Sequence, residues 1–180
     1  MAMTFEKITR EPAQTAPLII AGIGAAALIG AWIFQYGFGL QPCPLCLDQR
    51  IAYYFAIPLA LLLAAGASAG ASRKVLIAGF AAITLSMLWN AGLGAYHSGI
   101  EWGFWPGPQD CSGPINDLGT AGGLLKQLES IRIVRCDEVQ WRFLGLSLAG
   151  YNVLISLALA ATAAWAALRI RKSDHGSSSV

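Results

Sequence analysis

Four uninterrupted apolar segments divide this chain and leave it few alternatives to a membrane fold. They cover about residues 17–38, 51–69, 75–96 and 145–168. Each segment is close to the roughly 20 residues that an α-helix needs to cross the hydrocarbon core of a bilayer. The composition agrees, because 56% of the 180 residues are hydrophobic and only 12% are charged. We therefore predict an all-α membrane protein, a four-transmembrane-helix bundle that forms a single integral membrane domain over residues 1–180.

Two loops are expected on one side of the bilayer, at about residues 39–50 and 97–144. The second is far longer than the others, and long loops in compact domains are usually functional or disordered. Residues 121–132 place leucine and isoleucine on one helical face and charged residues on the other. This pattern predicts a short interfacial helix that lies in the headgroup plane of the lipid bilayer.

The distribution of positive charge orients the bundle. Lysine and arginine crowd close to the expected helix ends on the side opposite the two loops, at Arg73 and Lys74 and again in the run from Arg169 to Lys172. Short basic segments of this kind face the cytoplasm. We therefore expect both termini to be cytoplasmic and the two loops to lie in an oxidising outer compartment. The net charge of +2 is too small to indicate a nucleic-acid partner.

All four cysteines fall in the two outer loops, at Cys43, Cys46, Cys111 and Cys136. Three explanations fit cysteines in this position: two structural disulfides, a metal site, or a redox relay. A bridge between Cys43 and Cys46 would close too short a loop to stabilise the fold, and such bridges suit thiol exchange better. Structural zinc usually draws on paired C-x-x-C or histidine-containing clusters, whereas Cys111 and Cys136 stand singly, so we expect no metal.

The first cysteine pair stands at the start of a predicted helix. Proline is favoured at the first helical position, which puts Pro44 at N1, Cys43 at the N-cap and Cys46 at N3. N-cap and N3 side chains can meet, and Cys46 and Arg50 are separated by one helical turn. A helix N-terminus and a nearby guanidinium both favour thiolate over thiol. The alternative for Arg50 is an arginine that extends to the membrane interface and pairs with Asp48.

A relay in this position needs an electron acceptor inside the membrane. A dissolved quinone is the natural candidate, because Arg50 can donate a hydrogen bond to a quinone oxygen and stabilise the charge that builds on reduction. His97, at the outer end of the third apolar segment, lies at a similar depth and is a second candidate for quinone binding. The alternative for His97 is an interfacial histidine with no chemical role.

Several motifs together closely resemble the bacterial disulfide-bond-formation protein B (DsbB) family, over essentially the whole chain. They are Cys43-Pro44-Leu45-Cys46 with Gln49-Arg50, Tyr96-His97 leading to Gly107-Pro108 and Cys111-Ser112, and Cys136 with Gln140-Trp141 and Phe143-Leu144-Gly145-Leu146. The vitamin K epoxide reductase type also combines four helices, C-x-x-C and quinone, but Gln49-Arg50 and Gln140-Trp141 favour the DsbB family. The non-enzyme alternative is a membrane scaffold with permanent disulfides, which would tolerate the loss of Arg50.

The resemblance implies a protein dithiol:quinone oxidoreductase in the bacterial inner membrane. By that resemblance, Cys111 forms a mixed disulfide with a reduced periplasmic dithiol oxidase of the DsbA kind. Cys136 then resolves the mixed disulfide and exchanges with Cys43, and Cys46 is the thiolate that meets ubiquinone or menaquinone beside Arg50. The resemblance does not separate these two quinones, nor a general oxidase from a paralogue dedicated to one client.

Overall fold

The computed structural model describes residues 12–107 and 136–172, and in these ranges four helices are long and apolar enough to cross a membrane. The helices are α2 (Pro12–Trp32), which continues as the π-helical turn η1 (Ile33–Gly37), α3 (Pro44–Ser68), α4 (Arg73–Glu101) and α6 (Leu148–Lys172). An antiparallel pair of short strands, β1 (Arg142–Phe143) and β2 (Leu146–Ser147), precedes α6. The predicted four-helix membrane bundle is confirmed.

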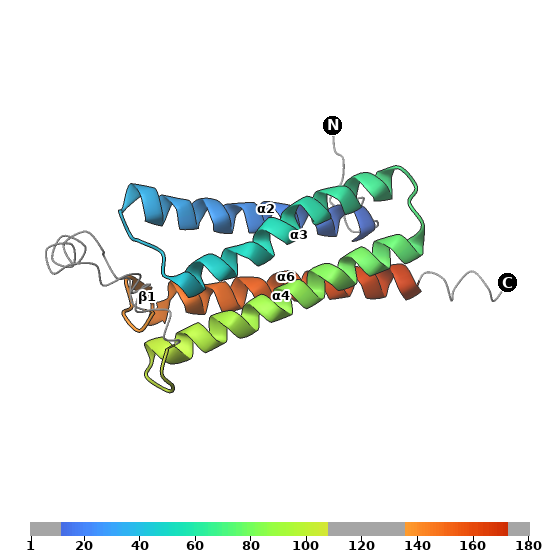
Figure 1. The fold of residues 1–180 in the computed structure, drawn as a ribbon. Helices are drawn as coiled ribbons and strands as arrows, with labels where there is room; N and C mark the ends of the chain where they lie inside the picture. The colour runs from blue at the N-terminus through green and yellow to red at the C-terminus, as the bar shows by residue number, and fades with distance from the viewer. Residues whose placement is uncertain (1–11, 108–135, 173–180) are drawn as a thin grey trace, which may run out of the picture.

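The four helices lie side by side as an up-and-down bundle (Figure 1). Helices that follow one another in the chain pack together, and α6 also contacts α2, which closes the bundle. The start of α2, the turn between α3 and α4 and the end of α6 lie at one end, and the hairpin lies at the other. This arrangement puts both ends of the bundle's chain on one side. The expected interfacial helix over residues 121–132 lies outside the described residues, as does Cys111.

The interior of the bundle combines small side chains with large ones such as Phe80 and Met87, and many other large apolar side chains face outward. Ala60, Ala163 and Ala166 are fully buried among the helices. Leu62 and Trp89, by contrast, are 69% and 71% exposed, although they lie in the middle of the chain's apolar segments. Helices that are apolar on all sides are typical of proteins whose solvent is lipid.

The helix α4 continues past Tyr96, where the apolar segment ends, and finishes at Glu101. Its last carbonyls are satisfied by a Schellman motif, in which the N–H of Gly103 bonds Ile100 and the N–H of Phe104 bonds Gly99. Gly103 has a φ of +75°, which a glycine adopts at little cost. As a result His97 and Glu101 both lie in the helix, one turn apart.

The chain returns to the bundle through a hairpin before the fourth helix. Leu144 and Gly145 form its two-residue turn, with φ values of +48° and +83° that match a type I′ turn. The fourth helix therefore begins at Leu148 and not within the turn. The hydroxyl of Ser147 accepts the N–H of Gly150 at 3.2 Å and so caps the first turn of α6.

Candidate thiol-disulfide site

The first cysteine pair forms the N-terminus of α3. Cys43 is the N-cap, with extended backbone angles, and Pro44 occupies the first helical position. The backbone N–H of Cys46 donates to Cys43 Sγ at 3.2 Å. The predicted capping positions of Cys43, Pro44 and Cys46 are therefore confirmed. The cap places the backbone N–H of Cys46 against the Cys43 sulfur, and Cys43 is only 2% exposed.

A third cysteine, Cys136, lies close to this pair although it is far from it in the sequence. The Cys43 and Cys136 sulfurs and a ring nitrogen of His97 all lie within 4.8 Å of one another. Cys43 and Cys46 are free thiols, whereas Cys136 is disulfide-bonded. A disulfide sulfur is not the thiolate ligand that a metal requires. The same closeness is what thiol–disulfide exchange needs, because a thiolate must reach a bridged sulfur directly.

Cys43 carries the negative charge in this arrangement. A hydrogen bond from the Cys46 thiol is the largest influence and, together with His97, lowers the pKa of Cys43 to about 5, although burial opposes the shift. The Cys43 sulfur is thus a thiolate at neutral pH when the pair is reduced. Helix N-termini stabilise thiolates in the same direction, as the sequence indicated for this stretch.

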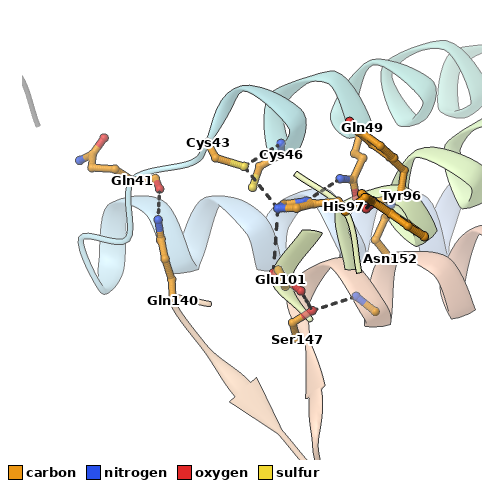
Figure 2. A network of polar contacts seen from close by, with 12 residues as sticks. Gln41, Cys43, Cys46, Gln49, Tyr96, His97, Glu101, Gln140, Ser147 and Asn152 are labelled. Carbon is orange, nitrogen blue, oxygen red and sulfur yellow. Dashed lines mark hydrogen bonds and ion pairs between the residues drawn. The ribbon is translucent and has the colours of Figure 1, made fainter. Parts of the chain in front are cut away.

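His97 belongs to α4, and its ring lies within a set of polar side chains that come from α3, α4, β2 and α6 (Figure 2). Its Nε2 is 3.6 Å from Cys43 Sγ and 3.9 Å from Glu101 Oε1, and its Nδ1 is 3.0 Å from Gln49 Nε2. Ser147 donates a short hydrogen bond to the other oxygen of Glu101. His97 is therefore a buried side chain in contact with Cys43, and its chemical role stays a prediction.

Four polar residues of this set were not singled out from the sequence as site residues. They are Gln49, Glu101, Ser147 and Asn152. Gln49 and Asn152 lie inside apolar helices, and a polar side chain within a membrane span is a functional candidate by default. That signal was available in the sequence. It does not say which partner each side chain meets, because the partners come from other helices.

Arg50 points toward the end of the first helix. Its Nη1 donates to Gln35 Oε1 at 2.7 Å, and Gln35 belongs to the π-helical turn η1. Turns of this type are frequent at functional sites. The pairing with Asp48 considered from the sequence is wrong, since the guanidinium forms no ion pair with a carboxylate within residues 12–107 and 136–172. One hydrogen bond leaves the remaining N–H groups of the guanidinium available to a ligand.

A cavity of about 430 Å³ connects these groups. Cys43, Cys46, Arg50 and His97 all line it, so the structure brings together four of the six predicted site residues around one space. Cys136 lies against the same group of sulfurs, and Cys111 lies outside the described residues. The rest of the lining is mostly apolar and comes largely from α2, η1, residues 138–143 and α6.

Aromatic rings form one wall of the cavity. Trp141 lies against Phe34 with ring centroids 5.0 Å apart and stacks on Phe143 at 5.9 Å with an interplanar angle of 15°. Gln140 fixes this segment by donating to the backbone oxygen of Gln41 at 2.7 Å. The Gln140-Trp141 motif therefore holds an aromatic surface beside the cysteine pair.

These features define a class of protein: a multi-pass membrane protein with a thiol–disulfide site beside an apolar cavity. Comparisons with known proteins agree. A sequence model for the disulfide bond formation protein DsbB matches residues 13–166. Disulfide bond formation protein B of Saccharophagus degradans is 33% identical over 173 residues, which are 91% of this chain and 98% of that protein. The corresponding protein of Xanthomonas axonopodis pv. citri is 30% identical over 165 residues, 88% of this chain and 93% of that protein. The chain belongs to the disulfide bond formation protein B (DsbB) family.

Proposed function

We propose that this protein is a dithiol:quinone oxidoreductase of the bacterial inner membrane, which reoxidises a periplasmic DsbA-like dithiol oxidase and passes the electrons to a respiratory quinone. The observation that carries the proposal is the shared cavity. The free cysteine pair and the guanidinium of Arg50 open onto the same apolar space, which an electron acceptor dissolved in the membrane can occupy.

The lining of the cavity fits a quinone. Its volume of about 430 Å³ is within the range of roughly 300–1,000 Å³ that small-molecule sites occupy. The Trp141 and Phe143 rings offer flat apolar surfaces to a planar ring. Among the described residues Arg50 uses one N–H, toward Gln35, and its other N–H groups can donate to a quinone oxygen. A quinone bound there would supply a two-electron acceptor to the Cys43–Cys46 pair.

The protein's own part in the reaction is disulfide exchange. In the bridged pair, a Cys136 thiolate attacks Cys43 Sγ, so that the Cys43–Cys136 bond forms while the Cys43–Cys46 bond breaks and Cys46 keeps the electron pair. The sulfurs of Cys43 and Cys136 lie within 4.8 Å of each other, so the two atoms that would bond are neighbours in the fold. Cys111, outside the described residues, would take the mixed disulfide with the partner and then restore its bond to Cys136.

A quinone is a better acceptor than a soluble thiol pool for a partner of this kind. The system formed by DsbA, DsbB and quinone is itself the established example of how a bacterial periplasm is kept oxidising, and DsbA has a potential near −120 mV. Glutathione pools lie at or below about −180 mV, so reoxidation by them would run uphill by about 3 kcal/mol. Respiratory quinones are the oxidants that the membrane itself supplies.

The test is quinone reduction by the purified protein in detergent, followed by quinone absorbance after addition of a reduced DsbA-like protein. Separate reactions with ubiquinone and menaquinone identify the acceptor, and Cys46→Ser is the control. We expect catalytic loss of quinone, matched mole for mole by disulfide formed in the partner and abolished in the control. No turnover with either quinone and a competent donor would contradict the proposal and favour a scaffold with permanent disulfides.

The orientation of the bundle is part of the proposal. Arg73 and Lys74 stand at the turn between α3 and α4, and the basic end of α6 lies at the same end of the bundle. The positive-inside rule places that end in the cytoplasm. The cysteine pair and the hairpin then face the periplasm, where a soluble oxidase can reach them.

A further inference from the structure

A chain of hydrogen bonds runs through the interior of the bundle and ends at Cys43. Tyr53 donates to Asn152 Oδ1 at 2.7 Å, and Asn152 Nδ2 donates to Gln49 Oε1 at 2.6 Å. Gln49 Nε2 lies 3.0 Å from His97 Nδ1, and His97 Nε2 lies 3.6 Å from Cys43 Sγ. The chain therefore links side chains of α3, α4 and α6 to the sulfur at the N-cap of α3.

All hydrogen bonds of this series run in the same donor-to-acceptor direction, from Tyr53 toward His97. The oxygen of Asn152 accepts from Tyr53 and also from Asn90 Nδ2 at 3.3 Å, so its amide nitrogen faces Gln49. The oxygen of Gln49 is used by Asn152, which leaves its amide nitrogen, an obligate donor, for His97. The Nδ1 atom of His97 must then accept, and the ring proton of the neutral imidazole sits on Nε2.

We propose that Gln49 and Asn152 are positioning residues that hold His97 as the neutral Nε2–H tautomer, with this N–H directed at the Cys43 sulfur. The inference deepens the proposed function, because it concerns the cysteine that exchanges with Cys136. It gives His97 a role toward the cysteine pair, whereas the sequence placed it with the quinone. Burial supports the assignment, since Gln49 and His97 are 5% and 4% exposed and have no bulk water to exchange partners with.

The same geometry opposes an imidazolium at this position. A doubly protonated ring has an N–H at both nitrogens, so its Nδ1–H would face the amide hydrogens of Gln49. The contact with Gln49 therefore favours the neutral ring, which stabilises the Cys43 thiolate as a hydrogen-bond donor. The carboxylate of Glu101, 3.9 Å from Nε2, faces the same N–H.

The tautomer matters whenever a bond to Cys43 breaks. When the Cys111 thiolate attacks Cys136 Sγ, the Cys111–Cys136 bond forms while the Cys43–Cys136 bond breaks. The electron pair of the broken bond stays on Cys43 Sγ, and no proton has to be transferred. A hydrogen bond from Nε2–H stabilises this charge as it forms, and a better-stabilised leaving thiolate departs faster. With the proton on Nδ1 instead, Nε2 would present a lone pair to the thiolate and repel it.

Nitrogen NMR of the histidine ring tests the assignment directly. The chain has only two histidines, so a His175→Gln background leaves His97 as the one histidine signal of the full-length protein in detergent. In the reduced protein near neutral pH, the ring shifts and couplings show which nitrogen carries the proton. We expect a protonated Nε2 and an unprotonated Nδ1. A protonated Nδ1, whether in the other tautomer or in an imidazolium, would overturn the inference.

Two variants should reverse the donor–acceptor direction of the hydrogen bonds that link Asn152, Gln49 and His97, while they keep side chains of the same length. Gln49→Glu presents only acceptor oxygens to His97, so the proton should move to Nδ1. Asn152→Asp removes the donor to Gln49, whose amide should then turn its oxygen toward His97 with the same result. Gln41→Glu is the matched control, since the same substitution on an exposed side chain should leave the proton on Nε2.

The outcomes separate this inference from the proposed function. If both reversing variants are folded and keep an unprotonated Nδ1, then Gln49 and Asn152 do not position His97. The wild-type spectrum decides the tautomer even if one variant fails to fold. Because the NMR readout needs no quinone, an expected spectrum in a protein without quinone turnover would retain the positioning inference and reject only the oxidoreductase proposal.

Discussion

Replacement of Arg50 by methionine should remove most of the quinone reductase activity while leaving exchange with the partner intact. Methionine keeps the length and apolar body of the side chain but none of its donors. Arg50 is held by one hydrogen bond of 2.7 Å to Gln35, which directs the guanidinium along the cavity that the cysteine pair lines. A preorganised donor to an oxygen on which charge develops typically contributes about 100- to 1,000-fold in rate, or about 3 kcal/mol.

The assay is the steady-state rate of quinone reduction, with kcat and KM determined for the wild type and three variants. Arg50→Met should lower kcat by about 100-fold or more. Gln35→Leu should lower it less, by roughly tenfold, because the guanidinium remains but has lost one charged hydrogen bond of about 1.5 kcal/mol. Arg142→Met is the matched control, since Arg142 is an exposed cation on the hairpin and does not line the cavity.

A separate measurement shows that the effect belongs to the quinone side. In a Cys136→Ser background, the mixed disulfide between Cys111 and the partner is trapped. The same amount of it should form whether or not the protein also carries Arg50→Met. Unchanged quinone kinetics in a folded Arg50→Met protein would remove Arg50 from the site and refute the reasoning. Loss of both activities together would indicate that the substitution damages the fold.

Two further predictions concern the cysteine pair and the bundle. In the reduced protein, the absorbance of the Cys43 thiolate should appear as the pH is raised through about 5. Cys46→Ala should move this midpoint to higher pH, because the hydrogen bond from Cys46 is the largest cause of the low pKa of Cys43. Cys46→Ser retains a hydrogen-bond donor and should move the midpoint less. Equal midpoints in the wild type and Cys46→Ala would contradict this assignment. Gly94→Ala should destabilise the bundle by about 1–3 kcal/mol, since a Cβ there would lie 2.9 Å from Val153 Cγ2 and 3.3 Å from the backbone oxygen of Ala149. Thermal unfolding in detergent measures the loss, and Gly92→Ala, whose Cβ would meet nothing within 4 Å, should not lower the midpoint, because alanine is the better helix former.

The amino-acid sequence alone determined the features that depend on neighbouring residues. The four membrane helices follow from runs of apolar residues, because a helix in lipid satisfies its own backbone and needs only length and apolarity. The cap at Cys43 follows from Pro44 and the spacing of the cysteines, all within one turn. The family was also recognisable, since its motifs are short and local. The quinone, the DsbA-like partner and the order of the relay stay predictions.

Only the tertiary structure decided which side chains meet across the helices. Gln49 and His97 are 48 positions apart, Gln49 and Asn152 are 103 apart, and no local pattern relates them. Their contacts depend on how α3, α4 and α6 are rotated and aligned, to which the close approach of α4 and α6 at Gly94 contributes. The approach of Cys136 to Cys43 and the turn of Arg50 toward Gln35 arise in the same way. The sequence therefore supplies the reactive groups, and the packing of the helices decides which of them act together.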